Sequence, residues 1–155
     1  PLYSSAASDV YKRQARGRAQ SGDYGGAIAA AKLVPTDQGP IYQEAQRVIP
    51  AWAQRQQQQA ATRKVLADAT AQLKPNQASS YNRAIDLVSV VRPDQDGYPL
   101  VRSQVDAWSQ EILKLAQARA KAGQVAQAIA TAKLVPPNTA AYGPAQAELA
   151  KWQKP

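Results

Sequence analysis

The sequence predicts an all-α protein built as a short array of about three helical hairpins. Two observations lead to this prediction: the composition suits closely packed helices, and one pattern recurs along the chain. Alanine supplies 32 of the 155 residues, whereas Leu, Ile and Val together supply 27, and Phe and Met are absent. Alanine favours helix and lets neighbouring helices approach closely, so the sparse large side chains indicate thin, closely packed helices.

The clearest copies of the pattern lie near the two ends of the chain. Ala15–Pro35 reads ARGRAQSGDYGGAIAAAKLVP and Ala116–Pro136 reads AQARAKAGQVAQAIATAKLVP, at a separation of 101 residues. A more diverged copy lies between them, in which Ala84 and Trp108 take the places of Ala27 and Trp52. The spacing from Trp52 to Trp108 is longer than the spacing from Trp108 to Trp152, which fits an insertion in the Gln-rich residues 54–59. The approximate repeats are 15–53, 67–109 and 116–153.

Local signals define the helices in chain order. A first helix over 16–21 ends at Gly22, because glycine takes the left-handed position after a helix without steric cost. A short helix over 24–34 is closed by Pro35, and a long one over 41–73 follows Pro40. Pro93 closes a fourth helix over 78–91.

The remaining three helices repeat these signals. Residues 99–122 carry large apolar side chains spaced by three and four, the period of a helix face. Gly123 ends that helix, and a short helix over 124–135 is closed by Pro136. The last helix covers 141–153. The tryptophans Trp52, Trp108 and Trp152 stand in register with Ile, Leu and Val on these faces, which favours core positions over a ladder that stacks ligands.

One segment stands apart from the repeat. Ser4–Gln14 reads SSAASDVYKRQ, which looks like the translation of a transposase adapter from a sequencing library. We therefore expect residues 1–14 to be adapter-derived and residues 15–155 to form the helical repeat domain. Residues 15–155 hold 17 basic and 10 acidic side chains, a formal net charge of +7 against +8 for the whole chain.

The stretch from Gly22 to Ile28, GDYGGAI, resembles the turn and second helix of a tetratricopeptide repeat. The resemblance covers Ala15 to Trp152 and implies a short α-solenoid of such hairpins, although this unit exceeds the family's length of about 34 residues. The recurring A-I-x-x-A-x-x-V-P, followed by Tyr, Ala-Gln and Trp, is also similar to repeats of uncharacterised cyanobacterial proteins. Some of those carry a membrane anchor, which implies a scaffold within a membrane-anchored parent.

Little in the sequence supports catalysis or metal binding. The chain has no His and no Cys, so it lacks the commonest general base, the thiol nucleophile and the usual zinc ligands. Asp94-Gln95-Asp96-Gly97 resembles the start of a calcium loop, but Val105 stands where that loop needs a glutamate. We predict no enzyme, no catalytic residue, no cofactor, no metal and no small-molecule substrate.

Positive charge is the remaining functional signal. Lys32 and Lys133 occupy equivalent positions in two copies, as do Arg18 and Arg119, so these four are the candidate contacts for a partner. We expect a non-enzymatic scaffold that binds a protein or peptide. Two alternatives stay open: a basic surface for nucleic acid or anionic lipid, and a structural spacer in a larger anchored protein.

The sequence leaves localisation unknown. It contains neither a signal peptide nor an apolar run long enough to span a membrane. The chain begins with Pro1 and stops at Pro155 within the recurring pattern, so we expect it to be an internal part of a longer protein.

Overall fold

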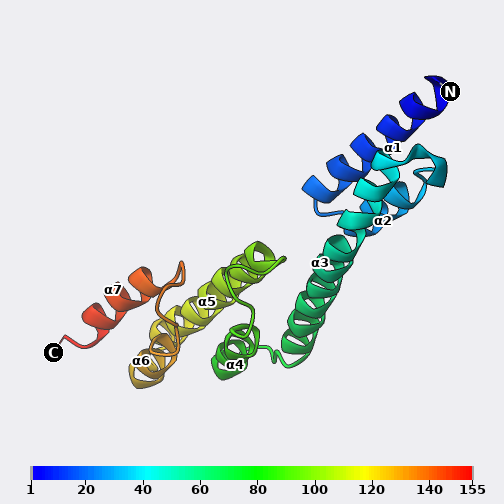
Figure 1. Ribbon diagram of the computed structural model, residues 1–155. Helices are drawn as coiled ribbons and strands as arrows, with labels where there is room; N and C mark the ends of the chain where they lie inside the picture. The colour runs from blue at the N-terminus through cyan, green and yellow to red at the C-terminus, as the bar shows by residue number, and fades with distance from the viewer. Residues whose placement is uncertain (1, 155) are drawn as a thin grey trace. The chain divides into compact units, whose positions relative to one another are not determined.

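The computed structural model describes residues 2–154, with side chains described from Ala6 onward (Figure 1). These residues form α-helices and one 3-10 turn, Thr36–Gln38, and include no strand, so the predicted all-α class is confirmed. The helices are α1 (Leu2–Gln20), α2 (Tyr24–Lys32), α3 (Pro40–Ala71), α4 (Ala78–Val88), α5 (Tyr98–Lys121), α6 (Val125–Ala132) and α7 (Tyr142–Trp152).

The helix boundaries follow the sequence signals, with one exception. From α2 to α7 each end lies within three residues of its predicted position. The predicted start of the first helix at residue 16 is wrong, because α1 begins at Leu2. Ser8 and Ala15 are buried and Tyr11 packs beside them, so the spacing of one helical face continues ahead of residue 15.

The chain divides into two compact units, residues 1–60 and 61–155, and the division falls inside α3. In unit 1, α1 packs closely against α2. The side chains that allow this approach are small, with Ala15, Ala27 and Ala31 all buried. Around them pack larger, partly buried side chains of α1 and α3: Tyr11, Ile41, Tyr42, Ile49 and Trp52.

Polar contacts fix the turn between α1 and α2. Gly22 has φ +82°, the left-handed conformation that glycine adopts readily. The carboxylate of Asp23 caps α2 by accepting the N–H of Gly26 at 2.9 Å. The side chain of Gln59, far along α3, donates to the Gly22 carbonyl at 3.0 Å and so joins α3 to this turn.

In unit 2, α5 lies at the centre of the packing. It packs against α4 and α6, and α6 packs in turn against α7. The main cluster is built around Val88, Trp108 and Ile112. A second, smaller cluster joins α5, α6 and α7 through Ala116, Ala132, Ile129, Leu149 and Trp152.

The repeat is visible in equivalent positions of the three long helices. Each has a buried hydroxyl residue, a buried alanine seven residues later, and a residue with positive φ seven residues after that. A short helix then begins two residues further on. The three sets are Ser8, Ala15 and Gly22; Thr62, Ala69 and Asn76; Ser109, Ala116 and Gly123.

This register locates the extra residues of the middle copy. Trp108 directly precedes Ser109, whereas Trp52 is separated from Thr62 by residues 53–61. The extra residues include the Gln-rich stretch and form continuous helix in α3 rather than a loop. They add about 13 Å to the helix, at 1.5 Å per residue. The division between the two units falls within them.

The prediction that all three tryptophans are core residues is correct for one of them. Trp108 is only 3% exposed, whereas Trp52 and Trp152 are half-buried. In unit 2, Leu73 packs against the cluster that contains Trp108. The position of Leu73 is occupied by Ala19 in α1 and by Ala120 in α5. Because alanine is smaller than leucine, it shields less of the indole of Trp52 or Trp152 from solvent.

We predict that Trp108→Ala lowers the free energy of unfolding by about 3–5 kcal/mol, because it leaves a cavity in the main cluster of unit 2. Trp52→Ala and Trp152→Ala should lower the free energy of unfolding by less, because they remove partly exposed indoles. Urea denaturation followed by circular dichroism measures all three. A loss near zero for Trp108→Ala would contradict its place in the core.

Candidate functional site

Lys32 and Lys133 have the same structural setting in their separate units. Lys32 is in the last turn of α2, and Lys133 is the residue that caps α6. Both side chains are exposed, and neither forms an ion pair with any residue that the structure describes. The carbonyl end of a helix attracts positive charge, so these positions also suit lysine for local reasons.

Arg18 and Arg119 are engaged with their own chain. The Arg18 guanidinium lies 3.1 Å from the carboxylate of Asp23, the residue that caps α2. Arg119 is half-buried and donates hydrogen bonds to the hydroxyl of Thr131 and, at 3.4 Å, to the carbonyl of Asn76. These contacts give both arginines a structural role, although the Arg18 side chain is still 56% exposed.

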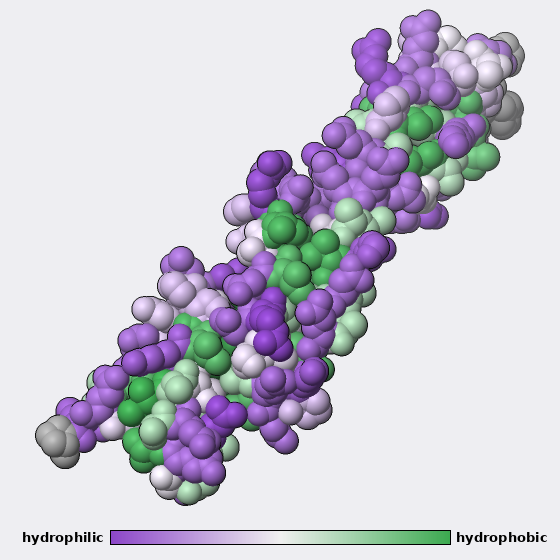
Figure 2. Space-filling view, turned by 90° about the horizontal axis from the view of Figure 1, so that it is seen from below, coloured by the Kyte–Doolittle hydropathy of each residue, from purple (hydrophilic) through white to green (hydrophobic). Residues whose placement is uncertain are grey.

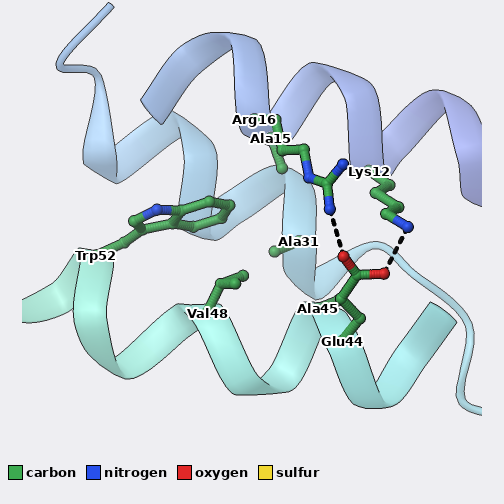
Figure 3. A pocket seen from close by; sticks show the side chains of 8 residues that line it. All are labelled: Lys12, Ala15, Arg16, Ala31, Glu44, Ala45, Val48 and Trp52. Atoms are coloured by element: carbon green, nitrogen blue, oxygen red, sulfur yellow. Dashed lines mark hydrogen bonds and ion pairs between the residues drawn. The ribbon is translucent and has the colours of Figure 1, made fainter. Parts of the chain in front are cut away.

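A small hollow lies where α1, α2 and α3 meet (Figure 3). Lys12 and Arg16 reach from α1 to the carboxylate of Glu44 on α3, and the indole of Trp52 closes the other end. The cavity volume is about 20 Å³, which is room for a single water molecule. This hollow is therefore too small to hold an organic ligand.

The pKa of the Glu44 carboxylate is displaced by its neighbours. The hydrogen bond from Lys12, at 2.5 Å, and the nearby positive charges of Lys12 and Arg16 hold the pKa of Glu44 below its usual value of 4.5. Partial burial opposes this effect but does not overcome it. Lys12 belongs to the adapter-like segment, whereas Arg16 and Glu44 belong to the repeat domain.

A larger hollow opens on the other side of Trp52. It has a volume of about 280 Å³ and is lined by Arg16, Ala19, Gln20, Tyr24, Trp52 and Arg55. The Arg55 guanidinium lies 5.8 Å from the centre of the Tyr24 ring and donates to the Tyr24 hydroxyl at 3.1 Å. Two aromatic rings and two guanidinium groups from three helices thus surround one open space.

The sequence prediction missed most of this set. The sequence alone predicts Trp52 as a core residue and gives Arg16, Tyr24 and Arg55 no binding role. The signal that could have found them is their departure from the repeat. At the positions of Arg16 and Tyr24, the last copy has Gln117 and Val125.

In unit 2, a groove of about 310 Å³ runs between α4 and α5. Its floor is apolar and its edge includes two arginines, each paired with an aspartate: Arg92 with Asp94 at 3.3 Å and Arg102 with Asp106 at 3.4 Å. The apolar lining residues are Ile85, Val88, Val91, Pro93, Tyr98, Val101 and Val105, and Ser89 lies at the edge. On the face that Figure 2 shows, hydrophobic surface forms separate patches among hydrophilic side chains.

The described residues contain neither a cluster of metal ligands nor a membrane-spanning helix. Among residues 2–154 no three acidic side chains come together in a way that could hold a metal ion. Within the same range no helix is long and apolar enough to cross a membrane.

Comparisons with protein-family models, with curated proteins and with solved structures found no match for this chain.

We predict that Glu44→Gln lowers the melting temperature near neutral pH, because it removes the ion pairs that join α1 to α3. Since folding lowers the pKa of Glu44, its contribution is present above the ordinary carboxyl pKa and is lost as pH falls through the lowered value. The difference between the two proteins should therefore shrink on acidification. Glu111→Gln, which breaks a pair within α5, is the control. A difference that stays constant with pH would contradict the assignment.

Proposed function

We propose that this chain is a non-enzymatic scaffold of tetratricopeptide-like helical repeats that binds an acidic, amphipathic segment of a partner protein. The observation that carries the proposal is the groove between α4 and α5 in unit 2. Its floor offers apolar contact to one face of a helix or an extended peptide, and peptide recognition commonly uses this arrangement. Its edge carries Arg92 and Arg102, each paired with an aspartate that does not itself line the groove.

Charge supports an acidic partner. Most acidic side chains with described contacts are already paired with cations of the same chain. The surplus is positive and solvent-exposed. Among the exposed cations, Lys32, Arg47, Arg63 and Lys133 form no ion pair with the described residues. Such a surface raises the rate of encounter with acidic partners and disfavours basic ones.

The groove favours a peptide over nucleic acid or anionic lipid. Those partners bind mainly through contacts between cations and phosphate groups and gain little from a floor of valine side chains. The basic residues are also dispersed, with no run longer than two along the sequence. A structural spacer does not require a binding groove. The absence of peptide binding would favour that role.

We predict that Ser89→Phe weakens the binding of a helical peptide with leucines on one face and glutamates on the other by about tenfold. The new ring would occupy the groove beside which Ser89 lies. Fluorescence anisotropy with a labelled peptide measures the affinity, and Ser103→Phe, on an exposed part of α5 outside the groove, is the matched control. Equal affinities for the two variants would rule out the groove.

We predict that the double variant Lys32→Glu and Lys133→Glu binds the same peptide more weakly at low salt, with a smaller loss at physiological salt. The control is Arg47→Glu with Arg63→Glu, which changes net charge equally. An equal loss in the control would mean that net charge alone, and not the ends of the short helices, guides binding. Duplex DNA and phosphatidylserine vesicles are tested in parallel. Binding to either that survives physiological salt would favour the alternative function.

A further inference from the structure

We propose that the hollow beside Trp52 in unit 1 is a second binding site, which takes a peptide. The peptide would carry an oxyanion, either a carboxylate or a phosphate, next to an apolar side chain. The two guanidinium groups of Arg16 and Arg55 would take the oxyanion, and the indole of Trp52 would take the apolar group. The site deepens the proposed scaffold function because it also serves a protein partner. It is formed by unit 1 alone and uses no residue of the groove in unit 2.

The internal repeat provides the first argument. Equivalent positions in the copies show which residues the fold requires and which it does not. The packing positions are shared: Ala15 with Ala116 and Ala31 with Ala132, all buried. The lining of the hollow is not shared, since Gln117 takes the place of Arg16, and Arg55 belongs to the extra residues 53–61, which have no counterpart in α5.

Three departures from the repeat therefore meet at one place. Arg16 comes from α1, Tyr24 from the start of α2 and Arg55 from α3, and all three line the same space. Packing between α1 and α2 does not require Arg16 or Tyr24, because the equivalent pair α5 and α6 packs as closely with Gln117 and Val125 at these positions.

The exposure of Trp52 provides the second argument. Trp108, at the equivalent position, is only 3% exposed, whereas Trp52, like Trp152, is partly exposed, and Trp52 lies between the two hollows. A half-exposed indole forgoes part of the free energy that its burial would give. Trp, Tyr and Arg are also the residues that most often dominate binding energy at protein interfaces.

The polar chemistry of the hollow selects an anion. Arg16 directs one Nη to Glu44, but a guanidinium carries five N–H groups in a planar fork, so donors remain for a ligand. The Arg16 side chain is 58% exposed, which leaves it accessible. Arg55 is held over the face of Tyr24, so its guanidinium is positioned before a ligand arrives. Two positioned guanidiniums bind carboxylate or phosphate with directional hydrogen bonds.

The three tryptophans allow a direct test with the intact chain. Labelling tryptophan with ¹⁵N gives one indole N–H signal for each, and Trp52→Phe assigns the signal of Trp52. Three short peptides serve as probes: one with adjacent leucine and glutamate, one with leucine and phosphoserine, and one with leucine and glutamine. We expect the first two to shift the Trp52 signal in a saturable way, and the neutral peptide to have no effect. Comparing glutamate with phosphoserine identifies which oxyanion is preferred.

Variants test the role of the arginines. Arg16→Gln with Arg55→Gln should weaken this binding by about tenfold or more, because two charged hydrogen-bond donors are lost. Arg63→Gln, an exposed cation elsewhere on α3, is the control and should bind normally. The unchanged signals of Trp108 and Trp152 would show that the variants remain folded.

Three results would overturn the proposal: no shift of the Trp52 signal with either acidic peptide, a shift that persists in the double variant, or an equal shift of Trp152. The result also separates this site from the scaffold function. An amphipathic peptide could bind in the groove, with an affinity that Ser89→Phe lowers, and leave the Trp52 signal unchanged. That result would overturn the site beside Trp52 and leave the scaffold function standing. A Trp52 shift that survives Ser89→Phe would support the site independently of the groove.

Discussion

In two of the hairpins, α1 with α2 and α5 with α6, the close contact between the long helix and the short helix that follows it depends on side chains no larger than alanine at the crossing. In unit 1 this contact is made by Ala15 and Ala31, and in unit 2 by Ala116 and Ala132. A larger side chain at any of these positions would push the two backbones apart and disturb the surrounding contacts. The large apolar residues are consequently placed beside the crossing rather than in it, as Trp152 is.

The sequence was sufficient to predict the helices because its signals are local. Gly22 and Gly123 adopt the left-handed backbone that ends α1 and α5, as their positions indicate. Asn76 performs the same task in the middle copy, and asparagine is the residue that most readily replaces glycine there. The predicted start of α1 is wrong because the resemblance of residues 4–14 to an adapter gives no information on whether they form a helix. In the structure, Ser8 and Tyr11 take the positions that Ser109 and Ile112 have in α5. These positions require only a small hydroxyl residue and a larger apolar one, so a sequence of any origin with that spacing can fill them.

The candidate sites were harder to predict because they are formed by residues from several elements. Periodicity identifies the buried face of each helix, but it does not show that Arg16, Tyr24 and Arg55 meet beside one indole. Repeated charge at repeated positions led to Arg18 and Arg119, and the structure shows that their equivalent positions have different partners. Equivalence in sequence therefore predicted equivalent backbone positions and did not predict equivalent side-chain contacts.

The small size of the buried side chains has a thermal consequence. The heat capacity change of unfolding grows with the apolar surface that becomes exposed, and a buried alanine adds much less of this surface than a buried leucine. Many of the buried residues here are alanine. The heat capacity change per residue should then fall below the typical value of about 12–15 cal/mol/K, which flattens the curve of stability against temperature. A chain built this way keeps a modest stability over a broad range of temperatures, and loses little of it in the cold.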